Sequence, residues 1–203
     1  MNVRVGVLAV QGAFLAHAEV LCDLGVEAVE VRQPNNLEGL DAIVLPGGES
    51  TTMSKLLVST GLWHPLNGLL HGGLPVFGTC AGMILLGTSI LDGRPDQSCF
   101  GVIDIAVRRN AYGRQIDSFE ADIDTAVGQF HGVFIRAPRI EAFGAKVEVL
   151  GTHNNEPVIV RQGTALAAAF HPELSADVHL HQFFITHVAG LAPATIDTTA
   201  KGR

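Results

Sequence analysis

The chain has 203 residues, of which 47% are hydrophobic and 16% charged, as expected for a soluble globular protein with one core. Its formal net charge of −7 and the lack of a basic patch argue against nucleic acid as a partner. Three widely spaced cysteines without a CxxC pair argue against a disulfide framework or zinc ribbon and favour the cytoplasm, and no run reaches the ~18 apolar residues of a membrane helix.

The first half of the chain alternates between predicted strands and helices. Residues 3–10 are apolar and β-branched, and because only Arg4 supplies positive charge and no cleavage site follows, we interpret them as a strand and not a signal peptide. Further strands are predicted over residues 26–31, 41–45 and 75–78, with helices over residues 13–24 (C-cap Gly25), from Ser50 or Thr51 (either of which can cap it), and over 81–86. This alternation is typical of a parallel sheet covered on both faces.

The second half of the chain has a different pattern, with short strands separated by turns. Strands are predicted over residues 102–107, 132–135, 147–150 and 157–160, as an antiparallel extension of the same sheet. Residues 164–170 are almost entirely apolar and return to the core, and residues 178–188 form a final helix. No linker divides the chain, so we expect one domain over residues 1–191 and a mobile polar tail over residues 192–203.

Cys80 occupies the most informative position in the sequence. It lies between a predicted strand end and a helix start, with Gly78 and Gly82 two positions to either side. Small residues at these positions are what a strained strand-to-helix turn requires, as in the nucleophile elbow, and such a turn pushes the side chain out of the turn. The alternative is a buried, inert cysteine. Cys22 and Cys99 lack this setting, and we interpret them as structural.

The elbow by itself does not make Cys80 a nucleophile at neutral pH. A helix terminus contributes roughly 0.3–1 kcal/mol, which lowers a thiol pKa of ~8.5 by about one unit at most. A base or cation beside the thiol is therefore required, and that group is normally histidine.

His171 is the strongest candidate for this base. It follows the apolar run over residues 164–170, and Pro172 biases it toward an extended conformation. Residues i and i+2 of an extended segment point the same way, so Glu173 can orient the His171 ring and stabilise the imidazolium. The alternative is a His-Pro turn with a solvated glutamate.

The other histidines lack a partner that spacing can identify. His179 and His181 raise the possibility of a metal site, but residues i and i+2 do not share a helix face. We therefore expect no metal and no cofactor.

These motifs, with several others, resemble a known family. Gly78-Thr-Cys-Ala-Gly-Met83 and His171-Pro-Glu173 resemble the nucleophile and His/Glu motifs of class I (triad) glutamine amidotransferases. The chain is further similar to the glutaminase subunits of ribose-5-phosphate-dependent pyridoxal 5′-phosphate synthases, over about residues 5–187, through Leu8-Ala-Val-Gln-Gly12, Leu45-Pro-Gly-Gly-Glu-Ser-Thr51, Arg109-Asn-Ala-Tyr-Gly-Arg-Gln115, Asp117-Ser-Phe-Glu120, Phe134-Ile-Arg-Ala-Pro138 and Phe170-His-Pro-Glu-Leu174.

The resemblance implies a flavodoxin-like, three-layer α/β sandwich that hydrolyses L-glutamine to glutamate and ammonia through a Cys80 thioester, and it places the chain among hydrolases and lyases. Cys80, His171 and Glu173 are then nucleophile, base and orienter. The residues that match the family's glutamine contacts are Gly47, Gly48, Glu49, Arg109, Ile135 and Arg136. An oxyanion hole could form from the backbone N–H groups of Gly48 and Ala81, and a substrate carboxylate and ammonium suit Arg and Glu.

A partner chain is also expected, because free ammonia at neutral pH is mostly protonated and must reach its acceptor by a sheltered path. The resemblance implies a hetero-oligomer with a separate synthase subunit that makes pyridoxal 5′-phosphate. Gln11 and Gly12, at the end of the first strand, are candidates for that contact.

Two alternatives remain. One is the glutaminase subunit of another amidotransferase, such as imidazole-glycerol phosphate synthase, which should lack the motifs between Arg109 and Glu120. The other is a non-catalytic interaction or redox-sensing protein with an exposed elbow cysteine. Substitution of His171 would separate a sensor from a glutaminase, because only the glutaminase needs the base.

Overall fold

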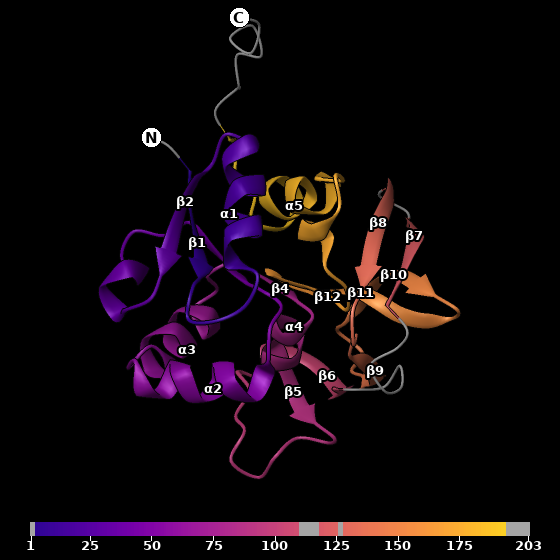
Figure 1. Cartoon of the computed structure of the whole chain (residues 1–203), viewed down its shortest axis with the longest axis horizontal. Coiled ribbons are helices and arrows are strands. Elements are labelled where there is room, and N and C mark those ends of the chain that lie inside the picture. The colour runs from indigo at the N-terminus through magenta and orange to yellow at the C-terminus, as the bar shows by residue number, and fades with distance from the viewer. Residues whose placement is uncertain (1–2, 110–117, 126–127, 194–203) are drawn as a thin grey trace, which may run out of the picture.

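The computed structural model describes residues 3–109, 118–125 and 128–193 (Figure 1). Within these ranges the helices are α1 (Phe14–Asp23), α2 (Ser50–Ser59), α3 (Trp63–His71), α4 (Ala81–Leu86) and α5 (His179–Phe183), with short turns η1 (Pro34–Leu37) and η2 (Pro172–Leu174) and a π-helical turn η3 (Phe184–Val188) that continues α5. The strands are β1 (Arg4–Leu8), β2 (Glu27–Val31), β3 (Ala42–Leu45), β4 (Val76–Thr79), β5 (Gly87–Ile90), β6 (Ile103–Arg108), β7 (Phe119–Thr125), β8 (Gly128–Phe134), β9 (Arg139–Phe143), β10 (Glu148–His153), β11 (Glu156–Gln162) and β12 (Ala165–Ala168).

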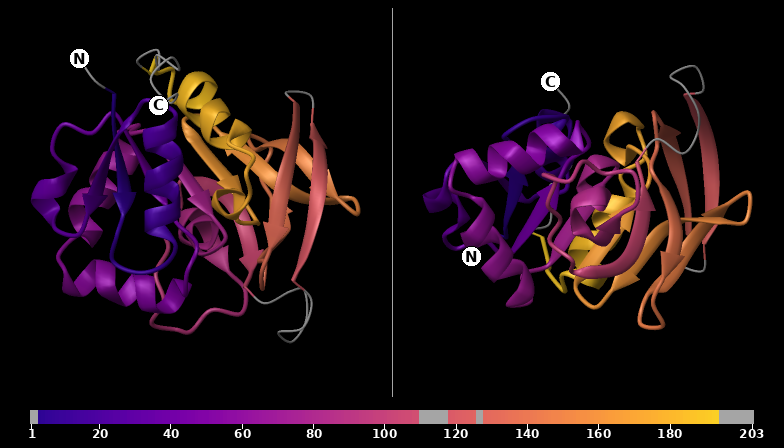
Figure 2. Two further views of the ribbon diagram at one scale, coloured as in Figure 1. Left: turned by 45° about the horizontal axis from the view of Figure 1, so that its top comes forward. Right: turned by 90° about the horizontal axis from the view of Figure 1, so that it is seen from below.

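The described strands form a main sheet of nine and a smaller sheet of three. The main sheet has the order β2-β1-β3-β4-β12-β11-β10-β7-β8, in which the first five strands are parallel and the remaining pairings antiparallel. Helices α1 and α5 cover one face of the parallel part, and α2, α3 and α4 lie on the other (Figure 1). Figure 2 shows the antiparallel strands, in salmon and orange, at the end of the molecule away from the purple helices. The predicted three-layer α/β fold with an antiparallel extension is confirmed.

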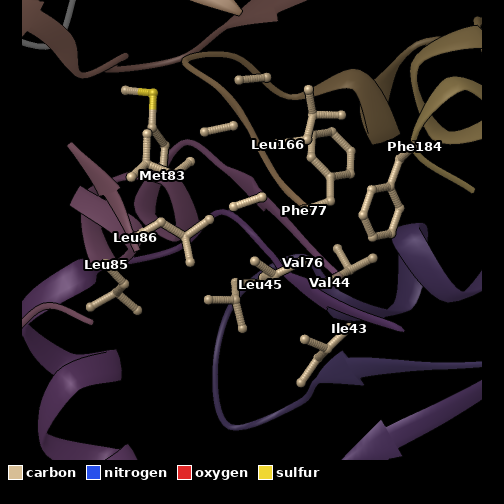
Figure 3. Close-up of a cluster of buried hydrophobic side chains, with 14 of the residues drawn as sticks. Ile43, Val44, Leu45, Val76, Phe77, Met83, Leu85, Leu86, Leu166 and Phe184 are labelled. Atoms are coloured by element: carbon tan, nitrogen blue, oxygen red, sulfur yellow. The ribbon is translucent and has the colours of Figure 1, made fainter. Parts of the chain in front are cut away.

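Burial along the strands explains why the parallel strands of the main sheet could be predicted from the sequence. Every residue of β3, β4 and β12 is buried, because helices cover both sheet faces and no side of these strands meets water. Leu45, Phe77, Leu166 and Phe184 pack in this core (Figure 3), where burial of each large side chain contributes about 1.5–3 kcal/mol. Among the described helices, none combines the length and apolar character needed to cross a bilayer.

One sequence expectation about the fold is wrong. The strand predicted over residues 102–107 exists as β6, but it pairs with β5 and β9 in the separate sheet and does not extend the main one. Its apolar alternation identifies a strand but not its neighbour, and β5, which follows α4 directly, provides the adjacent edge. Helix α3 and strands β5, β7 and β9 were not predicted from the sequence pattern. Residues 110–117 of the family motifs and 194–203 of the predicted tail lie outside the described residues.

The order of the parallel strands determines where the site forms. β1, β3, β4 and β12 are neighbours, so their carboxyl ends meet at one edge of the sheet. The loops that leave this edge carry Gln11, the Gly47–Glu49 segment, Cys80 and His171.

Candidate active site

Cys80 lies in a strained turn between β4 and α4. Its φ of 48° and ψ of −104° are unusual for a residue with a side chain and cost about 1–3 kcal/mol. Its backbone N–H donates to the carbonyl of Ala168 at 2.9 Å, which holds the turn against β12. A Cβ added at Gly78 would lie 2.7 Å from the Gly82 carbonyl carbon, and one added at Gly82 would meet the Leu45 carbonyl oxygen. The two flanking glycines are therefore required by close backbone packing, as predicted.

His171 and Glu173 are in contact, although by a different route from the one expected. His171 Nδ1 lies 2.8 Å from Glu173 Oε1, and the His171 backbone N–H donates to the Val133 carbonyl at 2.8 Å. The segment is not extended beyond His171, because Pro172 begins the turn η2, and this turn brings the carboxylate back to the ring. The predicted pairing is present, and its reason is a tight turn instead of strand-like alternation.

The electrostatics of His171 favour its charged form. Burial alone would lower the pKa of His171, but hydrogen bonds with Cys80 and Glu173, and the charges of both partners, outweigh burial and raise the pKa to about 10. The three side chains therefore form a connected set in which an imidazolium lies between a thiol group and a carboxylate.

A cavity of about 390 Å³ opens beside Cys80. Its lining residues are Gln11, Gly48, Glu49, Ser50, Cys80, Ile84, Arg109, Ile135, Arg136 and His171. The predicted glutamine contacts thus surround the thiol, except for Gly47. Gly47 packs directly against the His171 ring: a Cβ at Gly47 would meet His171 Cε1 and would lie 2.8 Å from Nδ1. A larger cavity of about 680 Å³, between β8 and α5, has none of the predicted site residues in its lining, so we place the chemistry in the smaller one.

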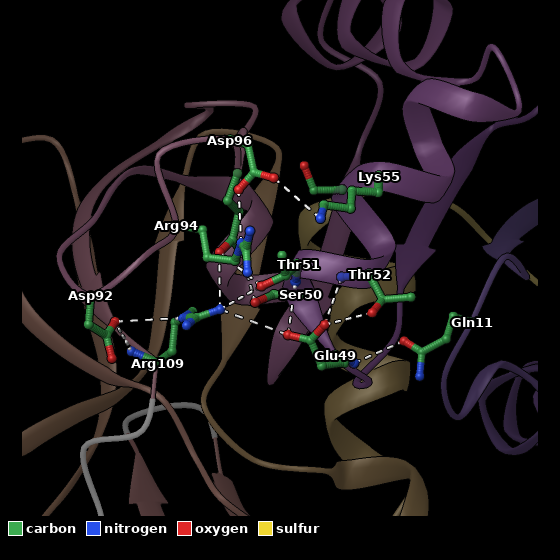
Figure 4. A network of polar contacts seen from close by, with 12 residues as sticks. Gln11, Glu49, Ser50, Thr51, Thr52, Lys55, Asp92, Arg94, Asp96 and Arg109 are labelled. Carbon is green, nitrogen blue, oxygen red and sulfur yellow. Dashed lines mark hydrogen bonds and ion pairs between the residues drawn. The ribbon is translucent and has the colours of Figure 1, made fainter.

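Glu49 caps helix α2 as well as lining the cavity (Figure 4). Its carboxylate accepts from the backbone N–H groups of Thr51 at 3.1 Å and Thr52 at 2.7 Å. Burial would raise the pKa of Glu49, but these hydrogen bonds, with one from the Thr52 hydroxyl, lower it to about 2. The helix begins at Ser50 as predicted, but the expectation that Ser50 or Thr51 would cap it is wrong, because the preceding carboxylate reaches both N–H groups.

Arg109 is held by residues that the sequence analysis did not identify. Its Nη1 donates to Thr51 Oγ1 at 2.6 Å and to Gln97 Oε1 at 3.1 Å, and its backbone N–H donates to Asp92 at 2.8 Å (Figure 4). Nη1 also lies 3.8 Å from the Glu49 carboxylate. Thr51 and Arg109 are 58 positions apart, so no local pattern could have indicated this contact.

The two partner candidates, Gln11 and Gly12, lie against the glycine loop. Gln11 Oε1 accepts from the Glu49 backbone N–H at 2.9 Å (Figure 4). Gly12 has a φ of 98°, and a Cβ there would meet the Gly47 carbonyl oxygen. Their contact with a partner stays a prediction, as do the oxyanion-hole roles of Gly48 and Ala81.

His179 and His181, which were considered as metal ligands, lie in different surroundings. The His179 side chain is 71% exposed and lies 2.7 Å from an Asp177 oxygen, whereas His181 is fully buried and contacts His17. Within the part of the chain that the structure describes, no cluster of three or more potential ligands forms a metal site.

Comparisons with known proteins identify relatives of this chain. Residues 7–190 match the SNO glutamine amidotransferase family. The chain is 55% identical over 190 residues to "Pyridoxal 5'-phosphate synthase subunit PdxT" of Mycobacteroides abscessus, covering 93% of this chain and 98% of that protein. It is 53% identical over 197 residues to the protein of the same name from Acidothermus cellulolyticus, covering 93% and 95%. A solved structure described as "Crystal structure of glutamine amidotransferase" superimposes with a TM-score of 0.87 at 50% identity, covering 92% of this chain and 99% of that one. The expected assignment to the lyases is not borne out by these descriptions.

Proposed function

The chain belongs to the SNO glutamine amidotransferase family, and from this premise we propose that it is the glutaminase subunit of a pyridoxal 5′-phosphate synthase. It hydrolyses L-glutamine to L-glutamate and ammonia, and Cys80, His171 and Glu173 perform the chemistry. The observation that carries the proposal is the connected triad at the wall of a cavity that also contains Glu49 and two arginines.

The reaction proceeds in two halves on the Cys80 sulfur. The thiolate attacks the side-chain amide carbon of glutamine, and the resulting oxyanion is stabilised by the N–H groups of Gly48 and Ala81. His171, as imidazolium, gives its proton to the departing nitrogen, so the C–N bond breaks, ammonia leaves and a thioester remains. His171, now neutral, takes a proton from water, which attacks the thioester and releases glutamate and the Cys80 thiolate. Glu173 holds the ring in position throughout.

The charges around the cavity suit the amino-acid end of glutamine. Arg136 is exposed at the cavity wall and can pair with the substrate carboxylate, with Arg109 as the second cation. Glu49 stays ionised over the whole physiological range and can attract the ammonium group. Ile135 offers an apolar surface to the substrate methylenes.

A second chain receives the ammonia. The relatives carry the name of a synthase subunit, and ammonia released into water would be protonated and lost to the synthesis. We therefore propose a hetero-oligomer in which this chain, a single domain over residues 1–191, docks on the synthase subunit and transfers ammonia directly. Three unpaired cysteines, with Cys22 exposed, support the cytoplasm as its location.

The deciding experiment measures glutamate release from L-glutamine by the purified chain, alone and with a pyridoxal 5′-phosphate synthase subunit. We expect low activity alone, a rise with the partner, and loss of activity in Cys80→Ala. Cys22→Ala, at an exposed cysteine remote from the cavity lining, is the matched control and should retain activity. Absence of hydrolysis with a competent partner would leave the sensor interpretation standing.

A further inference from the structure

Three buried polar side chains beside the triad have no role in the mechanism described so far. His17 on α1, Thr79 on β4 and His181 on α5 are each fully buried. Such groups cost free energy unless they are paired, so their presence together next to Glu173 requires an explanation. In the sequence, His17 is one of the histidines for which spacing identifies no partner.

The distances connect this cluster to the carboxylate of Glu173. Its Oε1 contacts His171, but its Oε2 is buried and has no fully formed hydrogen bond among the described residues. His17 Nε2 lies 3.3 Å from that oxygen and 3.1 Å from Thr79 Oγ1. On the other side of the ring, His17 Nδ1 lies 2.8 Å from His181 Nε2.

These contacts allow the tautomers to be assigned. An ionised Glu173 only accepts hydrogen bonds, so a bare Nε2 on His17 would direct a lone pair at a buried negative oxygen. We therefore assign the proton of His17 to Nε2, and Nδ1 then accepts from His181 Nε2–H. His181 Nδ1, which has no partner in the described structure, carries a lone pair in this arrangement and not an unsatisfied N–H.

We propose that His17 is a positioning residue for Glu173: its Nε2 lies 3.3 Å from the second carboxylate oxygen, and its hydrogen bonds with Thr79 and His181 fix its ring and tautomer. This rests on the proposed glutaminase triad. Through Glu173, His17 sets how strongly the carboxylate stabilises the His171 imidazolium, and hence the thiolate of Cys80.

The charge states of the cluster agree with this role. Burial, followed by the charges of His181 and His171, lowers the pKa of His17 well below its ordinary value. Burial also lowers the pKa of His181 to about 4, against an opposing influence of Asp177. Both rings are thus neutral at physiological pH. His17 supplies an N–H to Glu173 without adding a cation that would compete with the imidazolium.

The test compares His17→Asn with His17→Gln, two neutral polar side chains that differ by one methylene. The Gln amide can reach the position of Nε2 and donate to Glu173, whereas the Asn amide reaches only the position of Nδ1. His64→Asn, at an exposed histidine on α3, is the control for the chemical change. Cys80 alkylation by iodoacetamide is followed against pH in a Cys22→Ser, Cys99→Ser background, beside kcat and KM for glutamine with the synthase subunit present.

Without the His17 ring beside it, the Glu173 carboxylate is held less firmly against the His171 ring, so the imidazolium and the thiolate are both less favoured. We expect His17→Asn to move the acid midpoint of alkylation upward by about one pH unit and to lower kcat about tenfold, with KM unchanged. His17→Gln should stay close to the wild type. An unshifted midpoint in His17→Asn, or an equal shift in both variants, would overturn the proposal.

Imidazole ¹⁵N shifts of the wild-type chain provide a second test that does not depend on how a variant folds. Neutral His17 protonated at Nε2 is expected, and a bare Nε2 would contradict the assignment. If the wild type releases no glutamate with its partner, the proposed function fails, whereas the alkylation midpoint and the tautomer still decide whether His17 acts on Glu173.

Discussion

At the scale of single residues, the site depends on backbone atoms as much as on side chains. The elbow accepts Cys80 at positive φ because its glycine neighbours leave room for the Leu45 carbonyl and the helix. Gly47 likewise leaves room for the His171 ring, because a Cβ at this position would meet the ring. Positions without a side chain therefore determine the geometry of the triad.

Gly47→Ala tests this dependence. The new methyl would meet His171 Cε1, so the ring must move away from Cys80 and from its contact with Glu173. We expect kcat to fall about 100-fold, since a misplacement near 1 Å can cost that much. Steady-state glutaminase kinetics with the synthase subunit would show it. Unchanged kcat would mean that the loop gives way instead of the ring.

The titration of His171 provides a second prediction at this scale. Because hydrogen bonding and charge from Cys80 help to hold the pKa near 10, Cys80→Ala should lower it toward the ordinary value. NMR titration of the His171 imidazole in both proteins measures the change. In the wild type, the stabilisation of the fold by protonated His171 is complete below about pH 6.5 and is lost as the pH rises through about 10.

At the scale of elements, two helices are anchored in ways that relate stability to the site. The Glu49 carboxylate caps the start of helix α2, and α4 packs closely against the end of β3 at Gly82. Both contacts lie at the sheet edge where the cavity opens.

Glu49→Ala should destabilise the chain, because it removes the acceptor for two N–H groups of α2. We expect a loss of about 1 kcal/mol in the free energy of unfolding, measured by urea denaturation at pH 7. The contribution is present above the ordinary carboxyl pKa of about 4.5 and is lost as the pH falls through about 2. Glu49→Asp keeps a capping carboxylate and should retain most of the stability; an equal loss in both would argue against the cap.

Gly82→Ala should be more disruptive, because its methyl would run into the backbone carbonyl of Leu45, which has no rotamer to change. Overpacking of this kind costs at least about 1–3 kcal/mol. Gly68→Ala is the matched control: it lies in α3, where an added Cβ meets nothing within 4 Å, and should stabilise the helix by about 0.5–1 kcal/mol. Thermal unfolding of the two variants should therefore shift in opposite directions.

At the scale of the whole molecule, we expect the proposed synthase subunit to act on the active site through Gln11. Gln11 connects the end of β1 to the Glu49 backbone and lines the cavity, so a contact on this loop is transmitted to the glycine segment that carries the proposed oxyanion donor. We expect Gln11→Ala to reduce the ratio of partner-stimulated to basal glutaminase activity several-fold. Gln33→Ala, at an exposed residue outside the cavity lining, should leave this ratio intact, and an unchanged ratio in both would remove Gln11 from the coupling.

The amino-acid pattern predicted the parallel core, and it singled out Cys80, His171 and Glu173, which the structure brings into contact. Continuous apolar runs identify strands covered on both faces, and the glycines around Cys80 identify the elbow, because both signals lie within a few residues of each other. The parallel pairing of β12 with β4, which brings His171 beside Cys80, was not predicted and is seen in the structure.

Contacts between groups far apart along the chain could be seen only in the folded structure. The sheet to which β6 belongs, the support of Arg109 by Thr51 and Gln97, and the contact of His17 with Glu173 all join segments far apart along the chain. His17 and His181 are separated by 164 positions yet share a hydrogen bond in the core. Local periodicity predicts which face of a helix or strand is apolar. It does not predict which polar side chain of a distant element will contact that helix or strand in the folded chain.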